Sequence, residues 1–358
     1  MGQVGGKVFR TVEWAPGRAN GRVYYPQTLL SSTDIPEDVK ERARALLDDC
    51  TKSSVGAYSP SNGLFIVRHA VAEYISARDG VASSPEDIYM GSGASDVIKA
   101  VLTMFIEEVD GKPPELGIAQ ADYYLEENSN WALTTAELER SWHQASERHN
   151  VRALVVINPG NPTGQVLTRQ NIEDIIKFAK HRNLFILADE VYQENIVSKP
   201  FYSFKKVMAE MGHPYSKMEL ASFVTLSKGW SAECGLRSGY VELVRLNPDV
   251  EQAFRTTRAV MQCPTVLGQC ALHCVFSQEL NHIHCVLTER TKTAFETFNS
   301  IPGYFCNELD GSMFAYPRVE IPERAQQAAK QHEMSPDEFY CWQLLEMTEM
   351  QHAKVAVL

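Results

Sequence analysis

Long apolar runs, basic charge and a regular cysteine pattern are all scarce in this 358-residue sequence. No window reaches the roughly 18 consecutive apolar residues of a membrane helix, and the start lacks the apolar stretch of a secretory signal. Lys and Arg number 34 against 45 Asp and Glu, which gives a net charge of −11. Because nucleic acid and anionic lipid bind basic surfaces, we expect neither a nucleic acid nor a membrane as partner.

The eight cysteines show no Cys-x-x-Cys pair and no spaced framework, so they are interpreted as reduced thiols. One group combines ligands that would suit zinc: Cys263, Cys270, His273, Cys274, His282, His284 and Cys285. Its neighbours are apolar, so buried free thiols are the favoured interpretation and no metal is predicted. Reduced thiols predict a reducing compartment, which we take to be the cytoplasm, with a mitochondrial address left open.

The length of the chain allows two domains. Residues 1–33 have no hydrophobic period and are predicted to form an irregular N-terminal arm, and residues 34–68 add an N-terminal helical segment. Residues 69–268 alternate strand and helix patterns and are predicted to form a large domain. Residues 269–358 are rich in helix patterns, with a strand pair around Tyr304–Val319, and are predicted to form a small C-terminal domain.

Short apolar runs indicate strands buried on both faces of a parallel sheet, namely Val151–Ile157, Leu184–Ala188 and Phe223–Leu226. Ile88–Met90 is a further predicted strand. Thr168–Asn183, between the first two runs, has isoleucines at helical spacing. This alternation predicts an α/β fold with a mainly parallel sheet sandwiched by helices.

Ligands of such sheets bind at the carboxyl ends of the strands. The predicted strands are followed there by polar or glycine-rich segments: Gly91–Ser95, which opens a helix over Ala94–Ile106; Asn158–Gly164; Asp189–Tyr192; and Ser227–Gly229, with Arg237 nine residues beyond Lys228. We therefore expect an amide, a carboxylate, a phenol, an amine and a guanidinium to meet at one edge of the sheet.

The order of these segments resembles the class I aminotransferases that depend on pyridoxal 5′-phosphate (PLP), and among them the alanine aminotransferases. The resemblance rests on Asn-Pro-Thr-Gly at 161–164, Ala-Asp-Glu-Val-Tyr at 188–192 and Ser-Lys-Gly at 227–229 followed by Arg237, and it extends over most of residues 28–347. It implies a fold type I PLP-dependent transferase with a smaller α+β domain, acting as a homodimer. The implied reaction converts L-alanine and 2-oxoglutarate to pyruvate and L-glutamate, so the partners would be amino-acid and 2-oxo-acid substrates.

The resemblance also implies roles for single residues. Lys228 would be the catalytic residue, binding PLP as a Schiff base and moving the substrate's α-proton. Asp189 would face the pyridine nitrogen and favour its protonated form, while Asn161 and Tyr192 would bind the phenolate oxygen.

The phosphate of PLP would lie on the N-terminus of the helix that starts at residue 94. Its implied ligands are Gly93, Ala94, Ser95, Thr225, Ser227 and Arg237, together with Tyr58 from the partner subunit. Residues 34–68 would thereby include a dimer contact. The segment Gly311–Tyr316 is predicted to be mostly core packing, with Tyr316 as a candidate near the substrate.

The chain departs from the family pattern at three places. An internal segment near residues 114/115, which would bring the aromatic ring that stacks on PLP, is missing before the strand-like Ile118–Leu125. The C-terminal end beyond Met347 lacks the arginine for the substrate carboxylate, and residues 1–27 match nothing in the family. These gaps argue against turnover by this chain. A catalytically impaired isoform or truncated gene product that heterodimerises, and a PLP-dependent lyase of the same fold, therefore stay open as alternatives.

Overall fold

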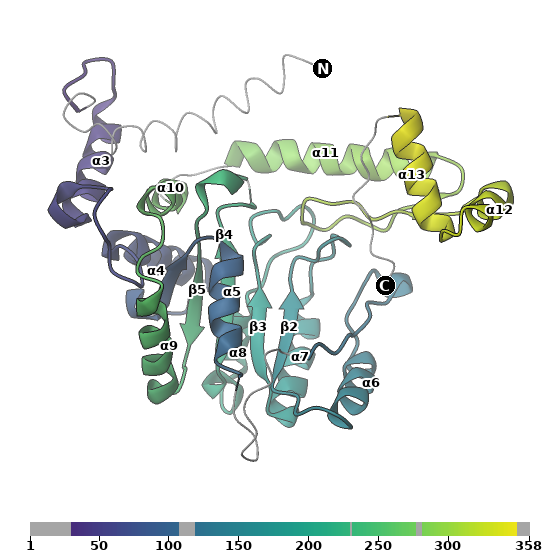
Figure 1. Cartoon of the computed structure of the whole chain (residues 1–358), viewed down its shortest axis with the longest axis horizontal. Coiled ribbons are helices and arrows are strands. Elements are labelled where there is room, and N and C mark those ends of the chain that lie inside the picture. The colour runs from purple at the N-terminus through teal and green to yellow at the C-terminus, as the bar shows by residue number, and fades with distance from the viewer. Residues whose placement is uncertain (1–29, 107–118, 230, 277–280, 349–358) are drawn as a thin grey trace.

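The computed structural model describes residues 30–106, 119–229, 231–276 and 281–348. A five-stranded sheet lies at its centre, with helices on both faces (Figure 1). In chain order its strands are β1 (Ile88–Gly91), β2 (Ala153–Ile157), β3 (Phe185–Asp189), β4 (Leu220–Thr225) and β5 (Gly239–Val244).

The strands lie in the order β1-β5-β4-β3-β2. Strands β2, β3 and β4 are parallel, whereas β5 is antiparallel to both β4 and β1. The predicted parallel strands are therefore confirmed within one to three residues, while β5 has no counterpart among them. The carboxyl ends of β1 to β4 share one edge of the sheet with the first residue of β5.

The helices are α3 (Glu37–Asp49), α4 (Phe65–Asp79), α5 (Ala94–Thr103), α6 (Thr135–Ser146), α7 (Arg169–Arg182), α8 (Phe204–Met211), α9 (Pro248–Val260), α10 (Val266–Phe276), α11 (Asn281–Ser300), α12 (Glu323–Gln331) and α13 (Pro336–Thr348). The predicted helix at 168–183 is α7, which begins with a capping box between Thr168 and Asn171. A two-stranded sheet pairs β6 (Tyr304–Phe305) with β7 (Arg318–Val319), which confirms the predicted strand pair. No helix of the described segments is long and apolar enough to span a membrane.

Alternate residues of the strands pack against different helices, as the period of a strand requires. Leu187, Phe223 and Val241 pack against α5 and α9, whereas residues of the opposite face pack against α4 and α10 or against α6, α7 and α8. Figure 1 shows α11 lying across the end of the sheet toward which β2 and β3 point. The division of the chain into domains stays a prediction.

Strand β2 is an edge of the sheet, and it is less buried than predicted. Leu154 and Val156 are buried, but Val155 is 48% exposed, so the prediction of burial on both faces is wrong for this strand. The segment Ile118–Leu125 is predicted to be strand-like, but its residues 119–125 form no strand, and Ile118 lies outside the described residues. Their one hydrogen bond to β2 runs from the Tyr123 hydroxyl to the Val155 carbonyl, at 2.8 Å. Val155 is exposed because no described strand or helix covers this side of β2.

Candidate functional site

The polar segments meet where the strands have their carboxyl ends. Two rows of residues, each paired across neighbouring strands, bring them together there. In one row Gly239 of β5 lies between Gly91 of β1 and Thr225 of β4. In the other, Asp189 of β3 lies between Ile157 of β2 and Phe223 of β4. The loops that leave these rows carry the residues predicted for the site. We call Gly93, Thr225, Ser227 and Arg237 the arginine group, and Asn161, Asp189, Tyr192 and Lys228 the lysine group.

Hydrogen bonds join Thr225, Ser227 and Arg237 of the arginine group. Arg237 donates from Nη2 to the Ser92 carbonyl at 3.0 Å and from Nη1 to Ser227 Oγ at 3.3 Å. Thr225 Oγ1 accepts from the Ser227 backbone N–H at 3.2 Å and donates to the Ser238 carbonyl at 3.1 Å. The guanidinium is thus held between the end of β1 and the end of β4, and its acceptors among the described residues are all neutral.

Two glycines make room for this arrangement. Gly93 has φ 91°, and a Cβ there would lie 2.5 Å from Arg237 Nη2. A Cβ on Gly239 would lie 2.8 Å from the Ala94 nitrogen. Either side chain would fill the space above the start of α5.

Helix α5 begins at Ala94 and has no side-chain cap. The backbone N–H groups of its first turn, at Ala94 and Ser95, have no partner within the helix. Free N–H groups and the helix dipole attract an anion. Together with the neighbouring guanidinium and two hydroxyls, they form a cradle whose chemistry fits a phosphate.

The lysine group gathers beside the second row. Asn161 Nδ2 donates to the Tyr192 hydroxyl at 3.3 Å, and Lys228 Nζ lies 5.6 Å from the centre of the Tyr192 ring. Burial raises the pKa of Tyr192 to about 12. Burial likewise raises the pKa of Asp189 to about 6, although the Val191 N–H and the Lys228 ammonium act in the opposite direction. An amine, a half-buried carboxylate, a phenol and an amide therefore face one small region.

Asn195, which sequence reasoning missed, holds this group in place. It is 3% exposed, and its Nδ2 donates to the carbonyl of Gly229, the residue after Lys228, at 3.3 Å. Its own N–H donates to the Tyr192 carbonyl at 2.8 Å, and its carbonyl accepts from the Ser312 N–H at 2.8 Å. One residue thus ties three segments that are distant in sequence.

Phe314 is the second residue that was missed. Its ring lies edge-on to Tyr192, with centroids 5.9 Å apart, and is 36% exposed. Tyr316, the candidate from the sequence, instead packs edge-on against Trp131 at 5.3 Å. The segment is thus less buried than core packing predicted. Its Gly311-Ser312 turn was the available sequence signal for a segment that folds back on the site.

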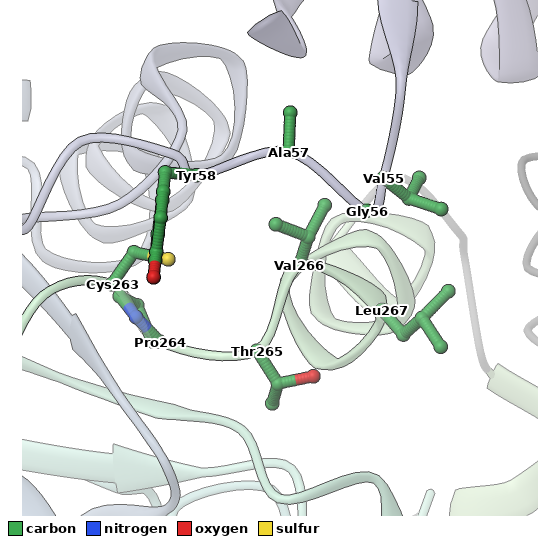
Figure 2. Close-up of a pocket in the computed structure, with 9 residues that line it drawn as sticks. All are labelled: Val55, Gly56, Ala57, Tyr58, Cys263, Pro264, Thr265, Val266 and Leu267. Atoms are coloured by element: carbon green, nitrogen blue, oxygen red, sulfur yellow. The ribbon is translucent and has the colours of Figure 1, made fainter.

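Tyr58 does not join either group through any contact among the described residues. Its side chain is 72% exposed and lines a separate cavity of about 310 Å³ with Cys263, Thr265 and Leu267. Figure 2 shows the Tyr58 ring beside Cys263. An exposed tyrosine at an open cavity is compatible with contact from a second subunit, which stays a prediction.

The cysteine and histidine group is only partly described. Cys263, Cys270 and Cys274 are free thiols, and burial raises the pKa of the Cys270 and Cys274 thiols. The side chains of three members lie outside the described residues, namely His282, His284 and Cys285. Within the described part of the chain, no three His, Cys, Asp or Glu side chains are grouped to hold a metal ion.

Comparison with known families places this geometry in context. Residues 116–354 match the family "Aminotransferase class I and II". The chain is 42% identical to alanine aminotransferase 1 of Bos taurus, over 89% of this chain and 71% of that protein, and 42% identical to the Homo sapiens protein of the same name with the same coverage. A probable mitochondrial alanine aminotransferase of Dictyostelium discoideum is 38% identical, over 87% of this chain and 64% of that protein.

The alignment with the bovine protein spans 355 positions but uses only 89% of this 358-residue chain. That protein therefore carries residues within the aligned stretch that this chain lacks.

Solved structures agree at the level of the fold. An aminotransferase from Escherichia coli superposes with a TM-score of 0.67 at 20% identity, covering 87% of this chain and 77% of that one. An alanine aminotransferase from Pyrococcus furiosus gives the same TM-score at 19% identity, covering 86% and 77%. At such identities the likeness speaks for the architecture alone.

Proposed function

Because the chain belongs to the aminotransferase class I and II family, we propose that it is a PLP-dependent transaminase. Its proposed reaction converts L-alanine and 2-oxoglutarate to pyruvate and L-glutamate. The observation that carries the proposal is the meeting of the arginine group and the lysine group at one edge of the sheet. The alanine aminotransferases at 42% identity support alanine as the amino donor.

The residues present fit PLP. The cradle above α5, left open by Gly93 and Gly239, would take the phosphate on the N–H groups of Ala94 and Ser95. Arg237 would pair with its charge, and the Ser227 hydroxyl would donate to it. The Thr225 hydroxyl would donate to it by turning away from the Ser238 carbonyl. The lysine group would take the ring. When bound, PLP supplies the electron sink for the α-carbon of the amino acid.

The remaining chemistry belongs to side chains of the chain. Lys228 Nζ would bind the cofactor covalently and afterwards carry the proton that leaves the substrate's α-carbon. Asp189 would hold a proton on the pyridine nitrogen, because a carboxylate beside a cation is ionised even where burial opposes it. Asn161 and Tyr192, already hydrogen-bonded to each other, would orient the ring oxygen.

The assembly is proposed to be a homodimer, with Tyr58 reaching the phosphate of the partner subunit. Its exposure beside an open cavity is the supporting observation. The free thiols among the described cysteines suit a reducing compartment. We propose the cytoplasm, with the mitochondrion as the alternative.

A second candidate follows from β2. The exposure of Val155 and the residues that the bovine relative carries in addition favour an impaired form that gains activity only with a complete subunit. This form would bind PLP through the same residues and fail at turnover.

Absorbance spectra of the purified chain with PLP test the proposal. Lysine-bound PLP absorbs visible light, and L-alanine should remove this band while 2-oxoglutarate restores it, with pyruvate released. Lys228→Ala should lose the band and about 10²–10⁴-fold or more of the activity, whereas Lys177→Ala, a surface lysine of α7, should change neither. A band that ignores alanine selects the impaired form. Pyruvate and ammonia released from L-serine over many turnovers without an acceptor select a lyase, because transamination without an acceptor stops after one turnover per subunit. A wild-type chain without the band contradicts the proposal.

A further inference from the structure

The N-terminal turn of α5 contains a carboxylate where the proposed function requires an anion to bind. Asp96 lies two residues beyond Ala94, and its Oδ2 accepts from the Ser92 N–H at 2.9 Å. Burial raises the pKa of Asp96, but the Arg258 guanidinium and the Ser92 N–H outweigh it, so the net shift is downward and the group is ionised at neutral pH. An uncompensated negative charge this close to a phosphate would repel it.

Arg258 of α9 compensates this charge. Its Nη1 lies 3.0 Å from Asp96 Oδ1 and its Nη2 lies 3.2 Å from Asp96 Oδ2, which makes a bidentate pair. Nη2 also donates to the Met90 carbonyl at the end of β1, at 3.0 Å. Arg258 is 4% exposed, so the pair is shielded from water and salt on its side.

Arg237 and Arg258, the two arginines discussed at this end of the sheet, therefore differ in the groups with which their charges interact. Arg237 donates to the neutral oxygens of Ser92, Ser227 and Cys234, and none of the described carboxylates pairs with it. The charge of Arg258 is already balanced by Asp96. Arg237 is free to neutralise a ligand, whereas Arg258 neutralises the protein beside that ligand.

We propose that Arg258 is a positioning residue for the cofactor phosphate: it cancels the charge of Asp96 and holds Asp96 against the Ser92 N–H, so that the N–H groups of Ala94 and Ser95 face the anion. The inference rests on the proposed function, because it takes the phosphate to lie above α5. Arg258 itself, whose guanidinium is held by Asp96 and the Met90 carbonyl, would make no contact with the phosphate. Its effect passes through Asp96, which makes the two residues separable by mutation.

A double-mutant cycle tests this role through binding alone. The dissociation constant of PLP is measured by equilibrium dialysis for the wild type, Asp96→Asn, Arg258→Met and the double variant, and inorganic phosphate is used as a competitor. Arg258→Met should weaken PLP binding about 10-fold or more, and less so at high salt, because it leaves Asp96 unpaired beside the phosphate. The double variant should recover to within about threefold of Asp96→Asn, since the repulsive charge is gone.

Arg255→Met is the matched control, because Arg255 lies on the same helix and pairs with Glu251 instead; its PLP affinity should equal that of the wild type. A double variant that binds as weakly as Arg258→Met would overturn the proposal, as would an unchanged affinity in Arg258→Met. Should Arg258→Met not fold, as judged by thermal unfolding without PLP, Arg258→Lys replaces it. Lys keeps the charge without the fork, so affinity should fall only about threefold, and an unchanged affinity overturns the proposal. A wild type that binds no PLP instead refutes the proposed function, and this inference with it.

Discussion

The arginine group and the lysine group lie at one edge of one sheet, yet they are supported very differently. The arginine group stands at the ends of β1 and β4 and the start of β5, three strands whose residues are buried almost throughout. Three of its members, Thr225, Ser227 and Arg237, are hydrogen-bonded to one another or to the backbone. The lysine group stands next to β2, the strand whose Val155 is 48% exposed.

This difference in support separates two properties that a transaminase usually combines, namely binding of the cofactor and turnover of the substrate. On the proposed roles, holding the cofactor by its phosphate would depend on the arginine group, which is well supported in the described structure. Reacting at the ring would depend on the lysine group, whose surroundings are more open on the β2 side. Retention of PLP and turnover should therefore respond to different substitutions in this chain.

The largest effect on turnover, after loss of Lys228, should come from Asp189→Asn. An amide cannot stabilise a protonated pyridine nitrogen, so kcat should fall roughly 10²-fold or more, while the PLP dissociation constant should change less than tenfold. Glu190→Gln is no suitable control because Glu190 is fully buried; Asp174→Asn on the surface of α7 is. A variant that loses PLP and keeps kcat would reverse the assignment of roles.

The same residue predicts a pH dependence of stability without cofactor. The pKa of Asp189 rises from its ordinary 3.8 to about 6 in the folded protein, so the folded state binds the proton more tightly than the unfolded state. Stability should therefore fall as pH rises from about 4 to about 6. The fall should be smaller in Asp189→Asn, where only the other carboxyl groups with raised pKa values, Asp87 and Glu190, still contribute. Urea unfolding at several pH values measures it. Equal pH profiles of the two proteins would contradict the assigned burial.

Arg237→Met should have the opposite effect to Asp189→Asn, lowering the affinity for PLP more than kcat. Loss of a charged donor to the phosphate should weaken PLP binding about 10–100-fold, with kcat at saturating PLP close to that of the wild type. Arg140→Met, on the exposed surface of α6, serves as control. If kcat falls while affinity stays, the two groups are not separable and the comparison above fails.

The smallest effect, on the free energy of unfolding, should come from a substitution beside the edge strand β2. Tyr123→Phe removes the hydroxyl that donates to the Val155 carbonyl, which should lower the free energy of unfolding by about 0.5–1.5 kcal/mol. Tyr124→Phe should cost less than about 0.5 kcal/mol, because that ring is exposed. Urea unfolding compares the two. Equal losses would mean that the Tyr123 hydroxyl does not support β2.

The place of the site at the carboxyl ends of the strands could be predicted from the sequence. Apolar runs predict buried strands, and ligands bind where such strands end. Lys228 and Asp189 follow directly from that rule. The exposure of Val155 could not be predicted in this way. An apolar run reports what a strand prefers, whereas its burial depends on whether another element is present to cover it.

The contacts of Asn195, Phe314 and Arg258 escaped prediction for a different reason. Asp96 and Arg258 are 162 residues apart, and Phe314 reaches Tyr192 only because the chain folds back at Gly311. Neither pairing has a local period or motif. A bidentate ion pair depends on how α9 packs against the start of α5, which is a property of the whole fold.

Asn195 also bears on how the protein is made. Its carbonyl accepts the Ser312 N–H and its side chain holds the peptide after Lys228, so Asn195 makes its full set of contacts only when the segment around residue 312 has docked. Domains fold as their residues emerge from the ribosome. The strands of the central sheet are all synthesised before residue 312, so the sheet can form before the contacts of Asn195 are complete.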